Sequence, residues 1–201
     1  CRCVFVGIES FNPETIAQMG KHQNVVAKTR AVIDRCHDNG ILVMAGLMLS
    51  PSIDSVGYID SIPQQLCDAG LHVPTFISFE TPFPGTPLFR RVAAMGEHAF
   101  MPNALLRDFN GYTLATRPVN ASVEAFVAAY SRCHQTVYSR RSRLAKLASD
   151  LPRLVKGGVA PILFDLLELS SEDATHVPGR TFIAGTDIPP PEEGQVPLTD
   201  H

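Results

Sequence analysis

Three apolar runs dominate the first eighty residues of this chain. They cover residues 3–8, 41–49 and 73–79, and each is rich in β-branched or aliphatic side chains with little polar alternation. Strands covered on both faces show such continuous runs, so the pattern predicts three buried strands of a parallel sheet. Pro74 interrupts the third run, and we therefore expect that strand to lie nearer a sheet edge.

Helical signals separate these runs. Asn12 and Pro13 predict a helix start, with an amide cap followed by proline in the first turn, and Gly20 predicts its end. Further helices are expected over 24–37, over 56–69 and from Pro87 onward. Strands that alternate with helices are typical of an α/β fold, either an open parallel sheet or a parallel barrel.

The remainder of the chain has a different pattern. Residues 100–119 are irregular, and 122–149 predict one long amphipathic helix whose later part is basic. The segment 170–201 is rich in Pro, Gly, Asp and Glu, which predicts a mostly disordered tail. We therefore divide the chain into an α/β part over 1–120, a helical extension over 121–169 and the tail.

Composition narrows the function classes. The 201 residues are 45% hydrophobic and 18% charged, as in one globular domain. The net charge of -3 argues against general nucleic-acid binding, and no apolar run is long enough to span a membrane. The first residue, Cys1, stands directly before a strand, so we expect a fragment of a longer protein.

The cysteines predict reduced thiols and a cytoplasmic setting, because an odd, scattered set is not a disulfide framework. No metal site is predicted either. Cys36-His37 and Cys133-His134 are adjacent pairs on expected helices, where neighbours in sequence do not face one another, and His22 has no partner at ligand spacing.

Polar residues stand where the three strands end. Glu9 and Ser10 follow the first run, Ser50 the second, and Glu80 and Thr81 the third. In parallel α/β folds, binding and catalytic groups gather at the carboxyl ends of strands. Glu9 is therefore either a ligand-binding carboxylate or a structural cap or ion-pair partner, and Glu80 is either a pocket group or part of a connecting loop.

Two further features depend on how the chain folds. Lys21 follows the first short helix and reaches the same pocket if that helix folds back over the strand ends; otherwise it is a solvated lysine. Pro84 lies in a proline-rich loop that could wall the site. The basic residues of 122–149 are either a contact surface for an anionic partner or a solvated helix face.

The order of these stretches resembles a known family. "VFVGIESFNPETIAQMGK", "GILVMAGLML", "ETPFPGTPLF" and "DFNGYT" follow one another as in the later half of radical S-adenosylmethionine (radical SAM) barrels. The resemblance is strongest to the subgroup that carries an N-terminal cobalamin-binding domain. It implies the later half of a partial parallel (βα)6 TIM-like barrel.

The resemblance also implies cofactors and a reaction. Members bind a [4Fe–4S] cluster through a C-x3-C-x2-C loop and cleave SAM reductively to a 5′-deoxyadenosyl radical, or transfer methyl groups. Glu9 would lie beside SAM, Lys21 would bind its carboxylate, and the strand over 41–49 would line its adenosine. The implied cofactor-side residues are Glu9, Ser10, Lys21, Gly46 and Ser50, and the implied substrate-side residues are Glu80, Thr81 and Pro84.

The chain departs from the family in one important respect. The cluster motif and the first three strands are missing, so the [4Fe–4S] ligands are not in this chain. We therefore expect an N-terminal barrel half as its partner and an unknown small molecule as substrate, with cobalamin as a further possible cofactor. Two alternatives stay open: a small acid/base enzyme that uses Glu9, Lys21 and Glu80, and a degenerate barrel that acts as a non-enzymatic binding module.

Overall fold

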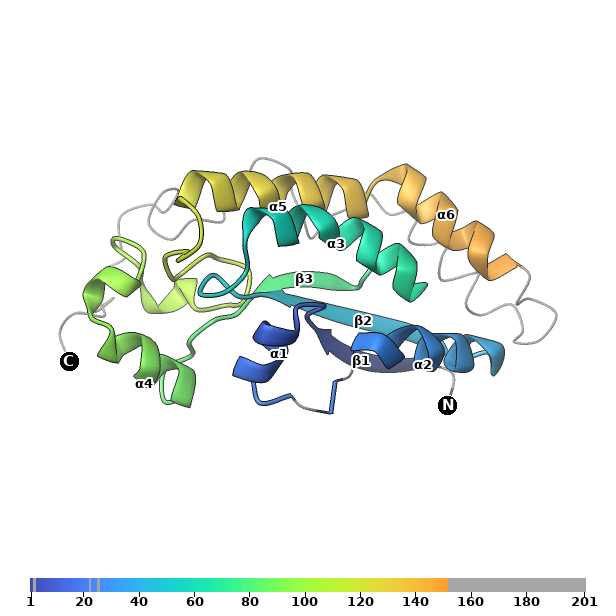
Figure 1. Ribbon diagram of the computed structural model, residues 1–201, viewed down its shortest axis with the longest axis horizontal. Helices are drawn as coiled ribbons and strands as arrows, with labels where there is room; N and C mark the ends of the chain where they lie inside the picture. The colour runs from blue at the N-terminus through green and yellow to red at the C-terminus, as the bar shows by residue number, and fades with distance from the viewer. Residues whose placement is uncertain (2, 22, 25, 152–201) are drawn as a thin grey trace.

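Three parallel strands form the centre of the molecule (Figure 1). This computed structural model describes residues 1, 3–21, 23–24 and 26–151. The sheet has the order β1-β2-β3, as the α/β pattern predicted, and it is consistent with part of a (βα) barrel. The expected tail over 170–201 lies outside the described residues, and the division into three parts stays a prediction. The strands are β1 (Cys3–Glu9), β2 (Leu42–Leu49) and β3 (Phe76–Phe79).

Side-chain caps begin several of the helices, and the Asn12 cap confirms the predicted start of the first. The side-chain oxygens of Asn12, Ser55 and Thr86 each accept a backbone N–H of the first turn of the helix that follows. Two short 3-10 helices, η1 (Glu97–Ala99) and η2 (Leu106–Asp108), lie in the irregular segment. The helices are α1 (Pro13–Gln18), α2 (Val26–Asp38), α3 (Val56–Ala69), α4 (Pro87–Ala94), α5 (Val123–Val137) and α6 (Arg140–Asp150).

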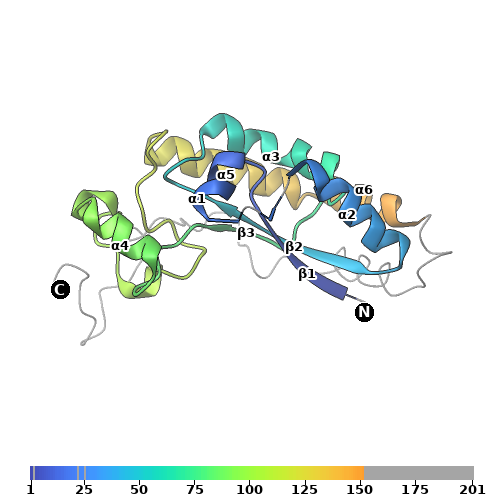
Figure 2. The same ribbon diagram turned by 60° about the horizontal axis from the view of Figure 1, so that its bottom comes forward.

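One face of the sheet carries the core. Figure 2 shows α2, α3 and α5 on the same side of the three strands, and in Figure 1 α3 and α5 run side by side. Fully buried side chains of α3, among them Ile59 and Leu66, meet Leu47 of β2 in one cluster. The ring of Tyr130 on α5 lies 4.8 Å from that of Phe79 on β3, so α5 packs directly on the sheet.

The expectation that the strands are buried on both faces is wrong for β1. Phe5 is 54% exposed, whereas Ile8, on the face toward the helices, is buried. Successive side chains of a strand point to opposite faces. Among the described residues the helices cover only the face to which Ile8 points, and the strand alternates accordingly. The prediction of an edge position for β3 is confirmed, although the strand begins only at Phe76, after Pro74.

The single long helix expected over 122–149 is also wrong. The helix ends at Val137, and Ser139 adopts an extended backbone (φ -63°, ψ 153°). Its hydroxyl oxygen accepts the Ser142 amide N–H, so Ser139 acts as the N-cap of α6. Serine offers the backbone an alternative to the helical hydrogen bond, and here that alternative divides the segment in two. Figure 1 shows α6 extending past the sheet.

Candidate functional site

The end of β1 is a strained turn that carries Glu9. This residue has φ +66°, in the left-handed region that few residues other than glycine adopt, and the pairing with β2 shifts register between Gly7 and Glu9. The Glu9 side chain folds back along its own strand. A Cβ placed on Gly7 would lie 2.5 Å from Glu9 Oε1, so only glycine leaves room for the carboxylate there. Strained backbone of this kind gathers at binding sites.

Lys21 meets this carboxylate. Its Nζ lies 3.0 Å from Glu9 Oε1, and the side chains are 43% and 16% exposed, respectively. The loop after α1 is held in place by Asn24, whose amide donates to the carbonyl oxygens of Gly7 and Ile8. The helix therefore folds back over the strand end, and the fold brings together two of the residues singled out from the sequence. Lys21 is the more exposed of the two, so the pair is open to solvent at the lysine side.

A glycine pair extends this site across the sheet. Gly7 of β1 is opposite Gly46 of β2 in the parallel register. The stacked rings of Phe5 and Phe76 lie over Gly46, and a Cβ there would meet the Phe76 ring at 2.6 Å. Gly46 is buried beneath these rings, and the Glu9 carboxylate occupies the space over Gly7, so the two glycines leave room for neighbouring side chains.

Ser10 lies behind this surface rather than on it. The residue is fully buried, its hydroxyl is 2.7 Å from the Tyr58 hydroxyl, and it accepts the Asn12 amide N–H at 3.0 Å. The Tyr58 oxygen also accepts the Phe11 amide N–H. Burial is the main reason that the pKa of Tyr58 is raised to about 12, so this hydroxyl keeps its proton at neutral pH.

Asp54 is the centre of the buried network beneath the strand ends. Its carboxylate accepts hydrogen bonds from the Asn12 amide at 3.0 Å, the Thr15 hydroxyl at 2.7 Å and the Ser50 backbone N–H at 2.7 Å. The residue is fully buried, and burial raises its pKa above the ordinary value of 3.8. These bonds fasten α1 to the end of β2.

Asp54 is not among the site residues expected from the sequence. The sequence offers Asp54 or Ser55 as the cap of α3, and the cap proves to be Ser55. The available signal was that Asp54 stands at the carboxyl end of a predicted strand, as Glu9 and Glu80 do. Its donors come from the other side of the site, 39 and 42 positions away for Thr15 and Asn12, which no local pattern reveals.

Ser50 and Glu80 form a second buried contact at the ends of β2 and β3. The Ser50 hydroxyl donates to Glu80 Oε2 at 2.6 Å and lies 2.9 Å from the Ser52 hydroxyl. Burial raises the pKa of Glu80; the Ser50 hydrogen bond and the positive charge of Arg91 lower it, while the charge of Asp54 raises it further. The buried carboxylate is therefore costly to ionise.

The other two substrate-side residues differ from each other. Thr81 is buried and its hydroxyl donates to the Phe79 carbonyl oxygen at 3.1 Å, a local bond within the loop. Pro84 is exposed in the turn before α4. The fold therefore places Glu80 and Ser50 together, and Glu9 and Lys21 together, in two separate groups.

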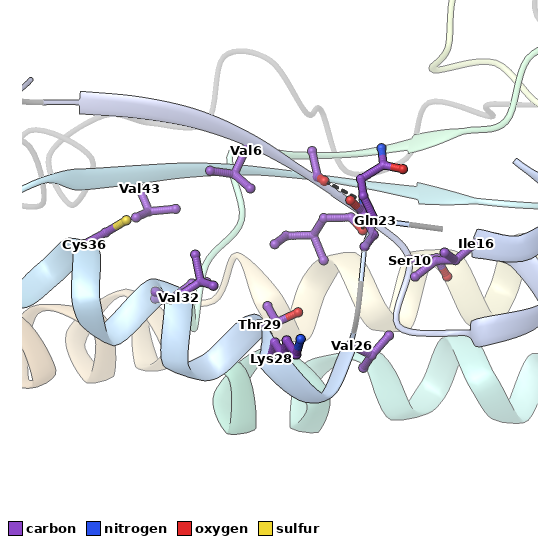
Figure 3. A pocket seen from close by; sticks show the side chains of 14 residues that line it. Val6, Ser10, Ile16, Gln23, Val26, Lys28, Thr29, Val32, Cys36 and Val43 are labelled. Carbon is purple, nitrogen blue, oxygen red and sulfur yellow. Dashed lines mark hydrogen bonds between the residues drawn. The ribbon is translucent and has the colours of Figure 1, made fainter. Parts of the chain in front are cut away.

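An apolar groove of about 250 Å³ runs between β1 and α2. Figure 3 shows side chains of the strands, such as Val6 and Val43, facing Val32 and Cys36 of the helix. Val32 is 52% exposed although it belongs to the helix face expected to be apolar. The groove thus lies beside the edge of β1 that has no strand partner among the described residues.

Cysteine placement bears on metal chemistry. All five cysteines are free; Cys133 is buried, Cys36 is partly exposed, and Cys1, Cys3 and Cys67 are exposed. In the described part of the chain, no three His, Cys, Asp or Glu side chains are arranged to hold a metal ion. Nor is any helix of that part long and apolar enough to cross a membrane.

Comparison with other proteins gives a weak similarity. The sequence matches no protein-family model. It is 28% identical over 97 residues to the bacteriochlorophyllide d C-8(2)-methyltransferase of Chlorobaculum tepidum, and 28% identical over 98 residues to the C-12(1)-methyltransferase of the same organism. The matches cover 48% and 49% of this chain but 21% of each relative, so this chain spans about a fifth of their length. Similarity to two methyltransferases supports the radical SAM resemblance coarsely and says nothing of cobalamin.

Proposed function

We propose that this chain is the C-terminal part of a radical SAM barrel and that it binds the methionyl end of SAM through Glu9 and Lys21. The ion pair of these two residues at the strained end of β1, 3.0 Å between Nζ and Oε1, is the observation that carries the proposal. The Glu9 carboxylate lies over Gly7, which is opposite Gly46 of the neighbouring strand.

The charges of the pair suit this end of SAM. The methionyl group carries one ammonium and one carboxylate, and a zwitterion can replace each partner of an ion pair with an opposite charge. Glu9 would accept from the ammonium and Lys21 would donate to the carboxylate. Gly7 and Gly46 would let the nucleoside approach the strands, once the rings of Phe5 and Phe76 move off Gly46.

The remaining cofactor-side residues lie beneath the surface that carries Glu9 and Lys21. Ser10 and Ser50 are fully buried, so we assign them to positioning rather than to contact with SAM.

SAM supplies a methyl group or, after reductive cleavage, a hydrogen-abstracting radical. The names of the two relatives favour methyl transfer, on a small-molecule substrate at the side of Glu80, Thr81 and Pro84.

The described residues do not fit an iron–sulfur cluster. Such a cluster needs a convergent set of thiolates, whereas Cys36 and Cys133 lie on different helices and Cys1 and Cys3 precede or begin β1, far along the strand from Glu9. We expect iron and sulfide reconstitution of this chain to give no cluster absorbance. A stoichiometric cluster on the chain would contradict the assignment. Nothing in the fold bears on cobalamin.

The free edge of β1 is where the other barrel half would join. β1 pairs only with β2 in the described sheet, and the apolar groove beside α2 follows its outer edge. An unpaired strand edge beside an apolar groove favours the addition of a parallel strand with its helix. A protein half that supplies the missing strands would cover both features.

SAM affinity tests the proposal, measured by equilibrium dialysis on the protein expressed from its full reading frame. We expect Glu9→Gln and Lys21→Ala each to weaken SAM binding at least tenfold. Arg132→Ala is the matched control, because it removes the cation of another exposed ion pair, that with Asp60 at 2.9 Å. Unchanged SAM affinity in the Glu9 and Lys21 variants, or equal weakening in the control, would overturn it.

A further inference from the structure

A second cavity lies apart from the Glu9–Lys21 pair. It has a volume of about 330 Å³ and is enclosed by the loop after β2, the start of the loop after β3, α4 and the segment that returns along residues 116–119. Two backbone bonds hold this returning wall: Arg117 N–H donates to the Ala99 carbonyl oxygen and Val119 N–H to that of Pro51, both at 2.9 Å. The volume falls within the range of small-molecule sites.

The walls of this cavity are largely apolar. Leu88 and Val92 of α4 and Met95, directly after its end, form one wall, and Pro82 and Pro118 close the sides. Met95 is 54% exposed, and no residue of α4 is buried. The apolar face of α4 is therefore only partly covered within the described chain, which leaves it available to an apolar ligand.

Glu80 is the buried carboxylate of the cavity, and Thr116 is a second buried polar residue in its lining. Glu80 is only 9% exposed and lines the cavity, while its Oε2 accepts the Ser50 hydroxyl at 2.6 Å. Its other oxygen, Oε1, has no hydrogen-bond donor among the described residues. A buried carboxylate with one unused acceptor gains most from a ligand that brings both a donor and a positive charge.

The basic residues of the cavity limit the ligand further. Arg117 lines the cavity with an exposed side chain, and the charge of Arg91 acts on the Glu80 carboxylate itself. A second cationic group on the ligand would meet these side chains. The arrangement therefore suits one positive charge at Glu80 and an uncharged remainder.

We infer that this cavity binds a small, mostly apolar molecule through one protonated amine held by the Glu80 carboxylate. Naming that molecule as part of the substrate rests on the proposed function. The binding itself does not, because it requires neither SAM nor the partner half. Ser50 then has a shared role: its hydroxyl orients Glu80, and its backbone N–H ties the end of β2 to Asp54.

The raised pKa of Glu80 agrees with this chemistry. Burial and the negative charge of Asp54 disfavour ionisation of this carboxyl and together outweigh the Ser50 hydrogen bond and the Arg91 charge, which favour it. An ammonium at Oε1 would favour the ionised form and replace the lost hydration.

Four six-carbon probes test the inference on the 201-residue chain without SAM, by ligand-observed NMR titration at pH 7: hexylamine, 1-hexanol, hexanoate and 1,6-diaminohexane. We expect hexylamine to bind at least tenfold more tightly than each of the others. Glu80→Gln should weaken hexylamine at least tenfold and change 1-hexanol less than threefold. Val92→Trp fills the cavity from α4 and should abolish binding of both.

Glu97→Gln is the matched control, because it removes an exposed carboxylate next to His98 and should leave hexylamine affinity unchanged. The inference is overturned if hexylamine and 1-hexanol bind equally, if Glu80→Gln retains amine binding, or if Val92→Trp has no effect. Loss of SAM binding without loss of amine binding would remove only the proposed function. Loss of amine selectivity with SAM binding intact would remove only this inference.

Discussion

The polar residues at the end of β1 and those at the ends of β2 and β3 differ in exposure and in their hydrogen bonds. At the end of β1, Glu9 takes up a strained backbone and pairs with a lysine whose side chain is 43% exposed. At the ends of β2 and β3, Asp54 and Glu80 are buried. Both carboxylates accept hydrogen bonds from Ser50, Asp54 from its backbone N–H and Glu80 from its hydroxyl. The Glu9–Lys21 pair is accessible to solvent at the lysine, whereas Asp54 and Glu80 fix the loops at the strand ends.

This difference separates ligand binding from stability. An ion pair whose lysine side chain is 43% exposed contributes little to the free energy of unfolding, because solvent already hydrates the ammonium. A buried carboxylate that accepts three hydrogen bonds contributes much, because its removal leaves three donors without a partner. Variants of the two groups should therefore affect different measurements.

Removal of the buried acceptor should have the largest effect. We expect Asp54→Ala to lower the free energy of unfolding by about 3–5 kcal/mol, because the Ser50 N–H, the Thr15 hydroxyl and the Asn12 amide lose their acceptor. Urea denaturation followed by circular dichroism measures the loss. Asp54→Asn keeps one acceptor oxygen and should lose less. If Asp54→Ala lowered the free energy of unfolding no more than Glu9→Gln, the proposed difference between the two polar groups would be wrong.

The glycine pair should respond unequally. Gly46→Ala pushes against stacked rings, at 2.6 Å from Phe76 and 3.2 Å from Phe5, and should destabilise the chain by about 1–3 kcal/mol. Gly7→Ala meets only the end of the Glu9 side chain, which can swing away, so its cost should stay below about 1 kcal/mol. The same denaturation experiment compares them, and equal losses would show that the two glycines play the same part.

Lowering the pH should raise the stability of the wild-type chain relative to that of Glu80→Gln. The pKa of Glu80 is raised above its ordinary 4.5, so the folded carboxyl holds its proton more tightly than the unfolded one. Its contribution to stability is then full below pH 4.5 and is lost as the pH rises through the folded pKa. The stability of Glu80→Gln relative to wild type should therefore increase between pH 4 and pH 7, as measured by urea titration at both values. An advantage for the variant that shrinks over this range would contradict the sign.

The smallest expected change in stability is that of the exposed pair. Glu9→Gln should cost less than about 1 kcal/mol, because the partner ammonium is nearly half exposed. Added salt should reduce even this difference, since screening weakens exposed pairs. A loss above 2 kcal/mol, measured at low salt against Asp54→Ala, would place Glu9 with the buried group instead.

Local signals predicted much of the fold. The Asn12 cap and the helix start at Pro87 are decided by residues within four positions, and the order of strands and helices follows. The break at Ser139 was missed because the amphipathic pattern continues across it, and a serine cap has the same spacing signal as a serine on a helix face. The exposed face of β1, which carries Phe5, was not predicted, because an apolar run does not indicate which faces of a strand other elements cover.

The sequence by itself determined which groups stand at the strand ends, since the strands and their polar terminators are neighbours in the chain. Only the tertiary structure decided what those groups do. Lys21 reaches Glu9 because α1 folds back, Asp54 accepts from donors 39 and 42 positions away, and Glu80 is buried against Ser50 of the neighbouring strand end. Hydrogen bonds and burial depend on distances in space, and spacing along the chain does not specify them.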